Sequence, residues 1–258
     1  MDFKFFGFSD AGKCRERNED RYLCNKEERL FLVADGMGGH ASGDEASRVA
    51  VEALEEFIVR SRKEEMKWPI PSRKNLSLEQ NRLLAGVIYS NRRIREVAGQ
   101  NPSLKGMGTT LLATIIEEER LAVANVGDSR LYRIRNGQIE QLTRDHSVVA
   151  EQERNGMLTE SQARRHPWRH ILTSALGLDE KPKVDLHVVK TMPEDLFLLC
   201  TDGLYNMLSS EEILTAVGAI RDKSLYKMGV SLVLKANLAG GADNIAVVLL
   251  AFSEEDGR

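Results

Sequence analysis

Residues 108–143, GTTLLATIIEEERLAVANVGDSRLYRIRNGQIEQLT, decide the fold class of this chain. Apolar and β-branched residues fill four short runs, as they do in buried or half-buried strands. Turn sequences separate the runs at EEER, at GDS and at Asn136-Gly137, and the last of these is typical of a type I′ hairpin. The stretch therefore predicts four consecutive antiparallel strands.

Similar strand patterns lie on both sides of this stretch. They are FKFFGFS (3–9), RYLCN (21–25) and LFLVA (30–34) before it, and VDLHVVK (184–190), DLFLLC (195–200) and NIAVVLLAF (244–252) after it. Between the two groups, residues 143–180 are polar and show no regular period. We expect an irregular insertion or lid there.

Helix patterns occur between groups of strands. Apolar residues recur at spacings of three and four over residues 43–65, which predicts an amphipathic helix that ends before Pro69. Ser77 and Gln80 form a capping-box pattern that opens a second helix, reaching about residue 98. Two further helices are predicted, one capped by Ser209 or Ser210 and one ending near residue 238.

About ten strands and four helices in this order argue against strand–helix alternation. We expect an α+β fold with two antiparallel sheets packed face to face and helices outside both, because this arrangement buries every apolar face. Neither an internal repeat nor a low-complexity linker divides the sequence, so residues 1–258 are expected to form a single domain.

Composition excludes several functional classes. The 258 residues carry a formal net charge of −3 with no basic face, which disfavours nucleic acid as a partner. No apolar run approaches the roughly 20 residues of a membrane span, and the first ten residues do not resemble a signal peptide. The three cysteines form no CxxC pair, which favours a reduced, cytoplasmic setting.

Aspartates recur where apolar strands begin or end. A carboxylate in such a position is costly unless it is solvated, capped or bound to a cation. Several converging carboxylates would favour a hard divalent ion, Mg²⁺ or Mn²⁺, over Zn²⁺. Glycine at position 36 would let its own carbonyl approach such an ion. The aspartates are Asp20, Asp35, Asp128, Asp202 and Asp243.

Two other interpretations remain open from the residues alone. Asp-Gly is a common turn dipeptide, so each aspartate can also be read as part of an ordinary turn. Gly36, Gly38 and Ala41 match a dinucleotide-binding fingerprint, but the second parallel strand that should follow is missing. A Gly-Lys-Ser/Thr motif is absent, which excludes a Walker loop.

A set of motifs in fixed order resembles the PPM family, the metal-dependent Ser/Thr protein phosphatases also called type 2C. The motifs are SDAGKCRERNED, VADGMGGHASGDEAS, GTTLLA, ANVGDSRLYRIRNG, TRDHS, CTDGLYNML and GGADNIAVVLL. They run from about Ser9 to Phe252, nearly the whole chain, and the form without extra domains is similar to the bacterial members.

The resemblance implies a four-layer αββα sandwich with two Mg²⁺ or Mn²⁺ ions at one end of the sheets. Asp35 would bridge both ions, the carbonyl of Gly36 would bind one, and Asp202 and Asp243 would complete the other. Two cations about 3.5–4 Å apart lower the pKa of a bridging water and stabilise in-line displacement at phosphorus. Neither a cysteine nor a serine nucleophile is needed, so a phosphoenzyme is not expected.

Three further residues match the family's catalytic positions. Glu19 and Asp20 correspond to the acidic pair that orients metal-bound water, and Arg15 corresponds to the phosphate-binding arginine. A guanidinium suits bidentate phosphate contact. Without the family match, Arg15 would be read as a surface ion pair with Glu16 or Asp20.

The sequence departs from the family pattern at two positions. Asn206 stands where many members have an aspartate that, with the equivalent of Asp128, is associated with a third and weaker metal, so the resemblance implies two ions and leaves the third open. Met37 stands where eukaryotic members have a histidine proposed as general acid, so no general acid is assigned. His40 and the other four histidines are read as surface or turn residues.

Residues 146–178 correspond to the family's variable flap, which is expected to gate substrate. Arg164, Arg165 and Arg169 either meet a phosphopeptide there or form a solvated face.

The expected function is hydrolysis of phosphoserine and phosphothreonine in proteins. The substrates would be targets of a Ser/Thr kinase in the same cell, and the enzyme would be a cytoplasmic monomer. The alternative is a catalytically inactive relative that serves as a binding or regulatory module. Such relatives usually lose metal ligands, whereas the four core ligand positions are intact here.

Overall fold

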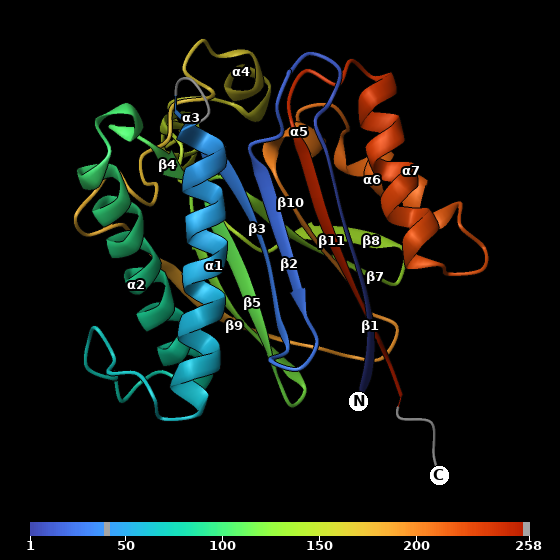
Figure 1. The fold of residues 1–258 in the computed structure, drawn as a ribbon. Coiled ribbons are helices and arrows are strands. Elements are labelled where there is room, and N and C mark those ends of the chain that lie inside the picture. Colours follow the sequence, from blue (N-terminus) through green and yellow to red (C-terminus); the bar gives the residue numbers. More distant parts are fainter. Residues whose placement is uncertain (39–41, 255–258) are drawn as a thin grey trace.

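Eleven strands form two antiparallel sheets in the described part of this computed structural model, residues 1–38 and 42–254 (Figure 1). The first sheet has the order β1 (Asp2–Asp10), β11 (Ile245–Ser253), β10 (Leu196–Cys200), β7 (Arg130–Arg135) and β8 (Gln138–Gln141). The second has the order β2 (Asp20–Asn25), β3 (Leu30–Met37), β5 (Leu111–Glu117), β6 (Arg120–Val126) and β9 (Asp185–Lys190), and β4 (Gly108–Thr109) pairs with β3.

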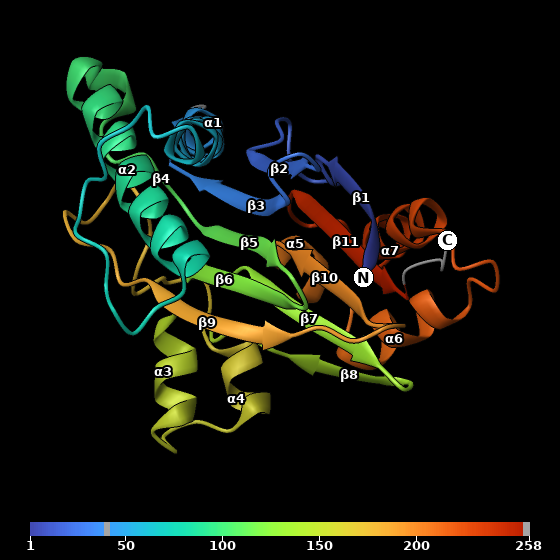
Figure 2. The same ribbon diagram turned by 90° about the horizontal axis from the view of Figure 1, so that it is seen from below.

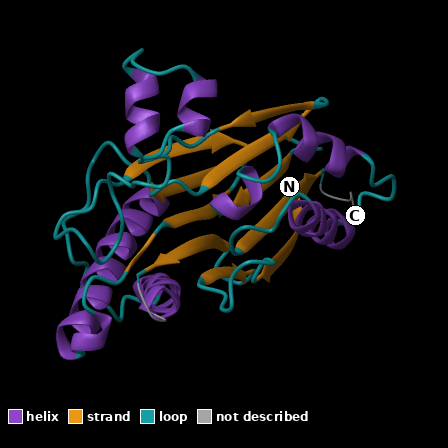
Figure 3. Cartoon of the chain, turned by 90° about the horizontal axis from the view of Figure 1, so that it is seen from above, coloured by secondary structure: helices purple, strands orange, loops and turns teal. Residues whose placement is uncertain are grey.

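Helices cover the outer face of each sheet. The second sheet carries α1 (Ser42–Arg62) and α2 (Leu78–Gln100), and the first carries α6 (Ser210–Gly218) and α7 (Leu225–Leu238). A short 3₁₀ helix, η1 (Pro102–Leu104), follows α2. Figures 2 and 3 show the strands between these two helical layers.

The side-chain pattern of β3 shows why the layers form. Leu30, Leu32 and Ala34 belong to the apolar cluster beneath α1 and α2, whereas Phe31 and Val33 belong to the cluster between the two sheets. A third cluster fills the space between the first sheet and helices α6 and α7. Successive residues of a strand point to opposite faces, so a strand buried on both faces reads as a continuous apolar run. The predicted four-layer αββα sandwich is confirmed.

The four helix predictions are also confirmed. Ser77 caps α2 and forms the capping box with Gln80, and Ser209, one of the two proposed residues, caps α6 through a second capping box. The helices predicted at 43–65 and up to residue 238 correspond to α1 and α7.

The prediction of four consecutive antiparallel strands over residues 108–143 is wrong at the GDS turn. Strands β5 and β6 pair, and β7 and β8 pair, but β6 and β7 belong to different sheets. Gly127 has a φ of +103°, and the chain crosses there from one sheet to the other. A glycine-containing turn has the same local sequence whether its strands pair or separate, so residue patterns alone could not distinguish the two.

The irregular segment 143–180 contains two short helices that its polar sequence did not reveal. They are α3 (Val148–Arg154), capped by Ser147, and α4 (Glu160–Arg165), capped by Thr159. Together with α5 (Asp202–Tyr205) they lie at the end of the sheets opposite the start of β1 and the end of β11 (Figure 1). Strand β3 ends, β11 begins and the chain crosses between the sheets at this same end.

No helix among the described residues is long and apolar enough to cross a lipid bilayer.

Candidate metal centre and active-site cleft

Buried carboxylates gather at this end of the sandwich. Asp20 opens β2 directly opposite Asp35 on β3, so the strand register places the two side by side. Asp202 follows β10 and Asp243 precedes β11, and their charges act on both Asp20 and Asp35. The strand-end positions seen in the sequence therefore come together in one cluster.

The electrostatics of the cluster favour a bound cation. Burial first, and then repulsion from neighbouring aspartates, raises the pKa of Asp35 well above its ordinary value. Burial also raises the pKa of Asp20 strongly, with the charges of Asp202 and Asp243 acting in the same direction. The pKa of Asp202 rises to about 6, again through burial and then through Asp243. Mutual repulsion of buried acids is relieved by divalent ions.

The two carboxylate oxygens of Asp202 have different surroundings. Oδ1 of Asp202 is buried and receives no N–H or hydroxyl donor among the described residues, while Oδ2 accepts a bond of 3.0 Å from the Asn206 amide. The Asp35 carboxyl is the other group within hydrogen-bonding reach of Asp202, and two acids can share this contact only while one of them is protonated. A buried oxygen left unsatisfied in this way is costly unless an ion or water completes it. The residues present therefore fit a hard divalent cation.

Other oxygens of the cluster are already occupied by protein donors. Asp243 accepts a bond of 2.8 Å from Arg15 at Oδ2 and one of 2.9 Å from the Asn244 N–H at Oδ1. In the described part of the chain, no group of three or more Asp, Glu, His or Cys side chains is placed to hold an ion by itself. Each Asp243 oxygen keeps a second lone pair, so Asp243 could bind an ion with or without release of Arg15, and water or backbone oxygens would complete the ligand set.

Arg15 does not form the alternative surface pair with Glu16 or Asp20. Its guanidinium pairs with Asp243, and this bond is the main cause of the raised pKa of Arg15. The arginine therefore lies at the acid cluster, within reach of a phosphate group bound there.

Gly36 allows β3 and the beginning of α1 to approach each other. A Cβ at position 36 would lie 2.1 Å from the Gly43 carbonyl oxygen, and one at position 43 would lie 2.8 Å from the Glu19 carboxylate. Glu19 in turn accepts a hydrogen bond from the Asp44 N–H in the first turn of α1, which opposes the rise in its pKa caused by burial. The glycine is thus required for packing, whatever its carbonyl binds.

Three residues that the sequence analysis did not select organise the cluster. Thr201 donates a bond of 2.6 Å to Asp20, and the Thr110 hydroxyl accepts one of 2.9 Å from the Asp35 N–H. The Asn244 amide donates to the carbonyls of Ala11 and Arg17 and accepts from the Glu19 N–H, so it fixes the loop before β2. Thr201 and Asn244 are each next to an aspartate of the quoted motifs, and Thr110 lies in the quoted motif GTTLLA, so these positions were the available signal.

A cleft of about 950 Å³ opens beside the cluster. Asp128, Asp202, Asp243 and Arg15 line it on the side of the sheets. From residues 146–178, Arg165, Arg169 and His170 line it among others, and the side chain of Arg164 lies outside what the structure describes. The cleft therefore joins the acid cluster to two arginines of the segment 146–178.

One histidine is placed differently from the prediction. His146 is fully buried, with Nε2 3.1 Å from Asp185 and Nδ1 accepting from the Gly127 N–H. The sequence around His146 is polar and irregular, so it does not predict these contacts with residues distant in the chain. His40 falls outside the described residues.

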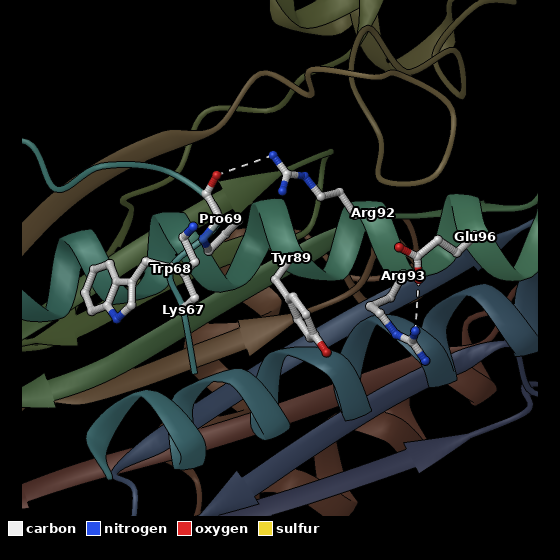
Figure 4. A pocket seen from close by; sticks show the side chains of 7 residues that line it. All are labelled: Lys67, Trp68, Pro69, Tyr89, Arg92, Arg93 and Glu96. Carbon is white, nitrogen blue, oxygen red and sulfur yellow. Dashed lines mark hydrogen bonds and ion pairs between the residues drawn. The ribbon is translucent and has the colours of Figure 1, made fainter. Parts of the chain in front are cut away.

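A second hollow, of about 460 Å³, is remote from the acids (Figure 4). Trp68 and Pro69 line it from the segment before α2, and Tyr89 and Arg92 line it from α2 itself. Among the described residues, Glu96 is the one acidic side chain that lines it, and Glu96 pairs with Arg93. This hollow lacks the acid cluster, so the cleft above is the candidate active site.

Comparison with known proteins agrees with the geometry. The family described as "Protein phosphatase 2C" matches residues 13–239, which is most of the chain. The chain belongs to this family. A Ser/Thr phosphatase, stp, of Listeria welshimeri is 38% identical over 246 residues, covering 94% of this chain and 93% of that protein. The Ser/Thr phosphatase PstP/Ppp of Mycobacterium tuberculosis superposes with a TM-score of 0.84 at 32% identity, covering 98% and 99% of the two chains.

A structure of the PstP catalytic domain holds two manganese ions and superposes with a TM-score of 0.81 at 32% identity, covering 98% and 99% of the chains. Protein phosphatase 2C membership makes this chain a metal-dependent protein Ser/Thr phosphatase, and it supports the enzyme over the inactive binding module. The buried Cys200 lies in the core beneath α6 and α7, as a structural residue would.

Proposed function

We propose that the acid cluster holds two Mg²⁺ or Mn²⁺ ions and that substrate phosphate binds beside it in the cleft. Asp35 would bridge the ions, the Gly36 carbonyl would bind one, and Asp202 and Asp243 would bind the other. The observation that supports this assignment is the convergence of buried acids, in which the Asp35 and Asp202 carboxyl groups meet within hydrogen-bonding reach and Oδ1 of Asp202 receives no N–H or hydroxyl donor among the described residues.

The ions, when bound, supply the charge that activates water and neutralises the phosphate oxygens. The other tasks belong to the chain's own residues. Arg15 changes partner from Asp243 to a phosphate oxygen, since its guanidinium suits both. Asp20 and Glu19 orient the attacking water by accepting its hydrogen bonds. Thr201 holds Asp20 in place, and the N–H of Asp44 in α1 holds Glu19.

A third, weaker ion is proposed at Asp128. Burial, followed by the charges of Asp202 and Asp145, raises the pKa of Asp128 to about 8, so a cation there relieves repulsion. Asn206 donates to Asp202 where an aspartate would offer another ligand, and this makes the third site the weakest of the three.

The assignment is tested by diffraction from crystals soaked in Mn²⁺, with data collected at the manganese absorption edge. Two anomalous peaks between Asp35, Asp202 and Asp243 are expected, and Asp202→Asn should remove or weaken the peak farther from Gly36. Ions that bind away from these side chains would refute the assignment.

The wider setting is also part of the proposal. Residues 1–258 would form a single catalytic domain with the flap at 146–178, acting in the cytoplasm on proteins phosphorylated by a Ser/Thr kinase. The described cysteines are all free, which suits a reducing compartment. Exposed large apolar side chains are spread over strands, flap and helices, which favours a monomer, and light scattering should return a mass near 28.9 kDa.

A further inference from the structure

The loop that carries Asp128, residues 127–130, is hydrogen-bonded to His146, the first residue of the flap. The Gly127 N–H donates to Nδ1 of His146 at 3.3 Å, and the His146 N–H donates to the Gly127 carbonyl at 2.9 Å. Asn125 also donates to the Gly127 carbonyl and to the Arg144 carbonyl. The backbone on the N-terminal side of Asp128 is therefore fixed to residues 144–146, where the flap begins.

The C-terminal side of the loop is held by a charged pair. The Arg130 guanidinium contacts both carboxylate oxygens of Asp145, through Nε at 3.2 and 3.1 Å and Nη2 at 2.8 Å. Its carbon Cζ lies 3.6 Å from the centre of the Tyr205 ring, and its Nη1 donates to the Tyr132 hydroxyl at 3.0 Å. Bidentate and stacked contacts of this kind fix both the position and the orientation of the Arg130 guanidinium.

A residue of α5, Tyr205, contacts Asp128 itself. The Tyr205 hydroxyl donates a bond of 3.1 Å to the Asp128 carbonyl, and both residues line the cleft with Arg130 and Asp145. The loop also contacts the acid cluster, because the Ser129 and Thr110 hydroxyls lie 2.8 Å apart and Thr110 accepts from the Asp35 N–H.

We propose that Asp145 and Tyr205 are positioning residues that hold the Asp128 carboxylate toward Asp202 and so set the affinity of the weakest metal ion. The inference rests on the proposed role of Asp128. Neither residue needs to touch the ion. Asp145 acts through Arg130, and Tyr205 acts through its hydrogen bonds to the Asp128 carbonyl and to the Asp128 carboxyl group. Residues that orient metal ligands affect metal affinity about 10- to 100-fold.

The test counts bound Mn²⁺ in metal-free protein by the loss of the free-ion electron paramagnetic resonance signal. Asp145→Asn and Tyr205→Phe should each weaken the last ion about tenfold or more while leaving the first two unchanged. Tyr205→Phe keeps the ring beneath Arg130 and removes only the hydroxyl, so it remains informative if Asp145→Asn fails to fold.

The chain offers a matched control at the other end of the same strand. Arg135 of β7 pairs with Asp195 through two nitrogen atoms, at 2.5 and 2.6 Å, and Asp195 is buried at the opposite end of β10 from Asp202. Asp195→Asn breaks a similar buried pair far from the cleft. It should leave the affinity for all three ions at the wild-type value.

A double-mutant cycle separates positioning from direct binding. If Asp145 acts through Asp128, adding Asp145→Asn to Asp128→Asn should change Mn²⁺ affinity no further. Two results would overturn this inference and leave the proposed role of Asp128 intact. One is a further loss of Mn²⁺ affinity in the double variant, and the other is wild-type affinity for the last ion in both Asp145→Asn and Tyr205→Phe. If the wild type binds only two ions, or if Asp128→Asn keeps the third, the role of Asp128 and the inference both fail.

Discussion

Asp35, proposed here as a metal ligand, should cost the protein stability when no metal is bound. It lies opposite Asp20 in the strand register, and burial with repulsion raises its pKa well above the ordinary value. An acid whose pKa is higher in the folded than in the unfolded state loses stability as pH rises through that interval. The metal-free protein should therefore tolerate a neutral side chain at position 35 better than the native acid.

The expected result for Asp35→Asn is a higher melting temperature than wild type in EDTA at pH 8, with a smaller difference at pH 5. The gain should be a few degrees, since roughly 1 kcal/mol corresponds to about 2–4 °C in a domain of this size. Added Mn²⁺ should stabilise wild type and have little effect on the variant. Calorimetry with and without Mn²⁺ measures both effects, and equal stabilisation of the two proteins by Mn²⁺ would argue against Asp35 as a ligand.

Arg15 should behave as a phosphate-binding residue and not as a support for metal. Removing it in Arg15→Ala should raise KM for a phosphothreonine peptide about ten- to a hundredfold, the loss of roughly 1.5–3 kcal/mol in a charge-assisted contact. Because Arg15 occupies Oδ2 of Asp243, its removal should leave Mn²⁺ affinity equal to or tighter than wild type. Steady-state kinetics and Mn²⁺ titration on the same preparation check both parts, and weaker Mn²⁺ binding would contradict them.

At the scale of elements, the site depends on how closely β3 approaches α1. Gly36→Ala would place its Cβ 2.1 Å from the Gly43 carbonyl oxygen, where backbone on both sides must move. We expect a loss of more than about 2 kcal/mol in the free energy of unfolding, together with reduced activity.

Gly99→Ala in α2 is the matched control, because a Cβ there meets nothing within 4 Å. It should stabilise the protein by about 0.5–1 kcal/mol, as alanine does in a helix. Urea unfolding compares the two variants. A similar effect of both substitutions would show that the approach of β3 to α1 does not constrain position 36.

Sequence patterns predict the individual helices and strands better than they predict which strands and side chains pair with one another. The apolar run of β3 and the Ser77 capping box are local patterns, and the sequence predicts both. The crossing between sheets at Gly127 is not predicted, because the sheet to which a strand belongs depends on which distant strand lies beside it. The same limit applies to the site: strand-end aspartates marked the cluster, whereas the pairing of Arg15 with Asp243 and the burial of His146 depend on contacts far apart in sequence.

The whole molecule should unfold as one unit. Strands β1 and β11 pair along their full length, from Asp2 with Ser253 to Asp10 with Ile245, so the first and last strands lie side by side in one sheet. The apolar cluster between the sheets joins side chains from both. Calorimetry of the metal-free protein should show a single transition whose calorimetric and van't Hoff enthalpies agree, and two separable transitions would contradict the single domain.

The central claim is that the strand-end acids make this chain a metal-dependent phosphatase. The most direct test is phosphate release from a phosphothreonine peptide, measured against Mn²⁺ concentration and in EDTA, for wild type and Asp202→Asn. We expect no turnover in EDTA, saturable activation by Mn²⁺ in wild type, and a loss on the order of 10³-fold in the variant, equivalent to several kcal/mol of transition-state stabilisation. Wild-type turnover in EDTA, or undiminished turnover by Asp202→Asn with Mn²⁺, would contradict the claim.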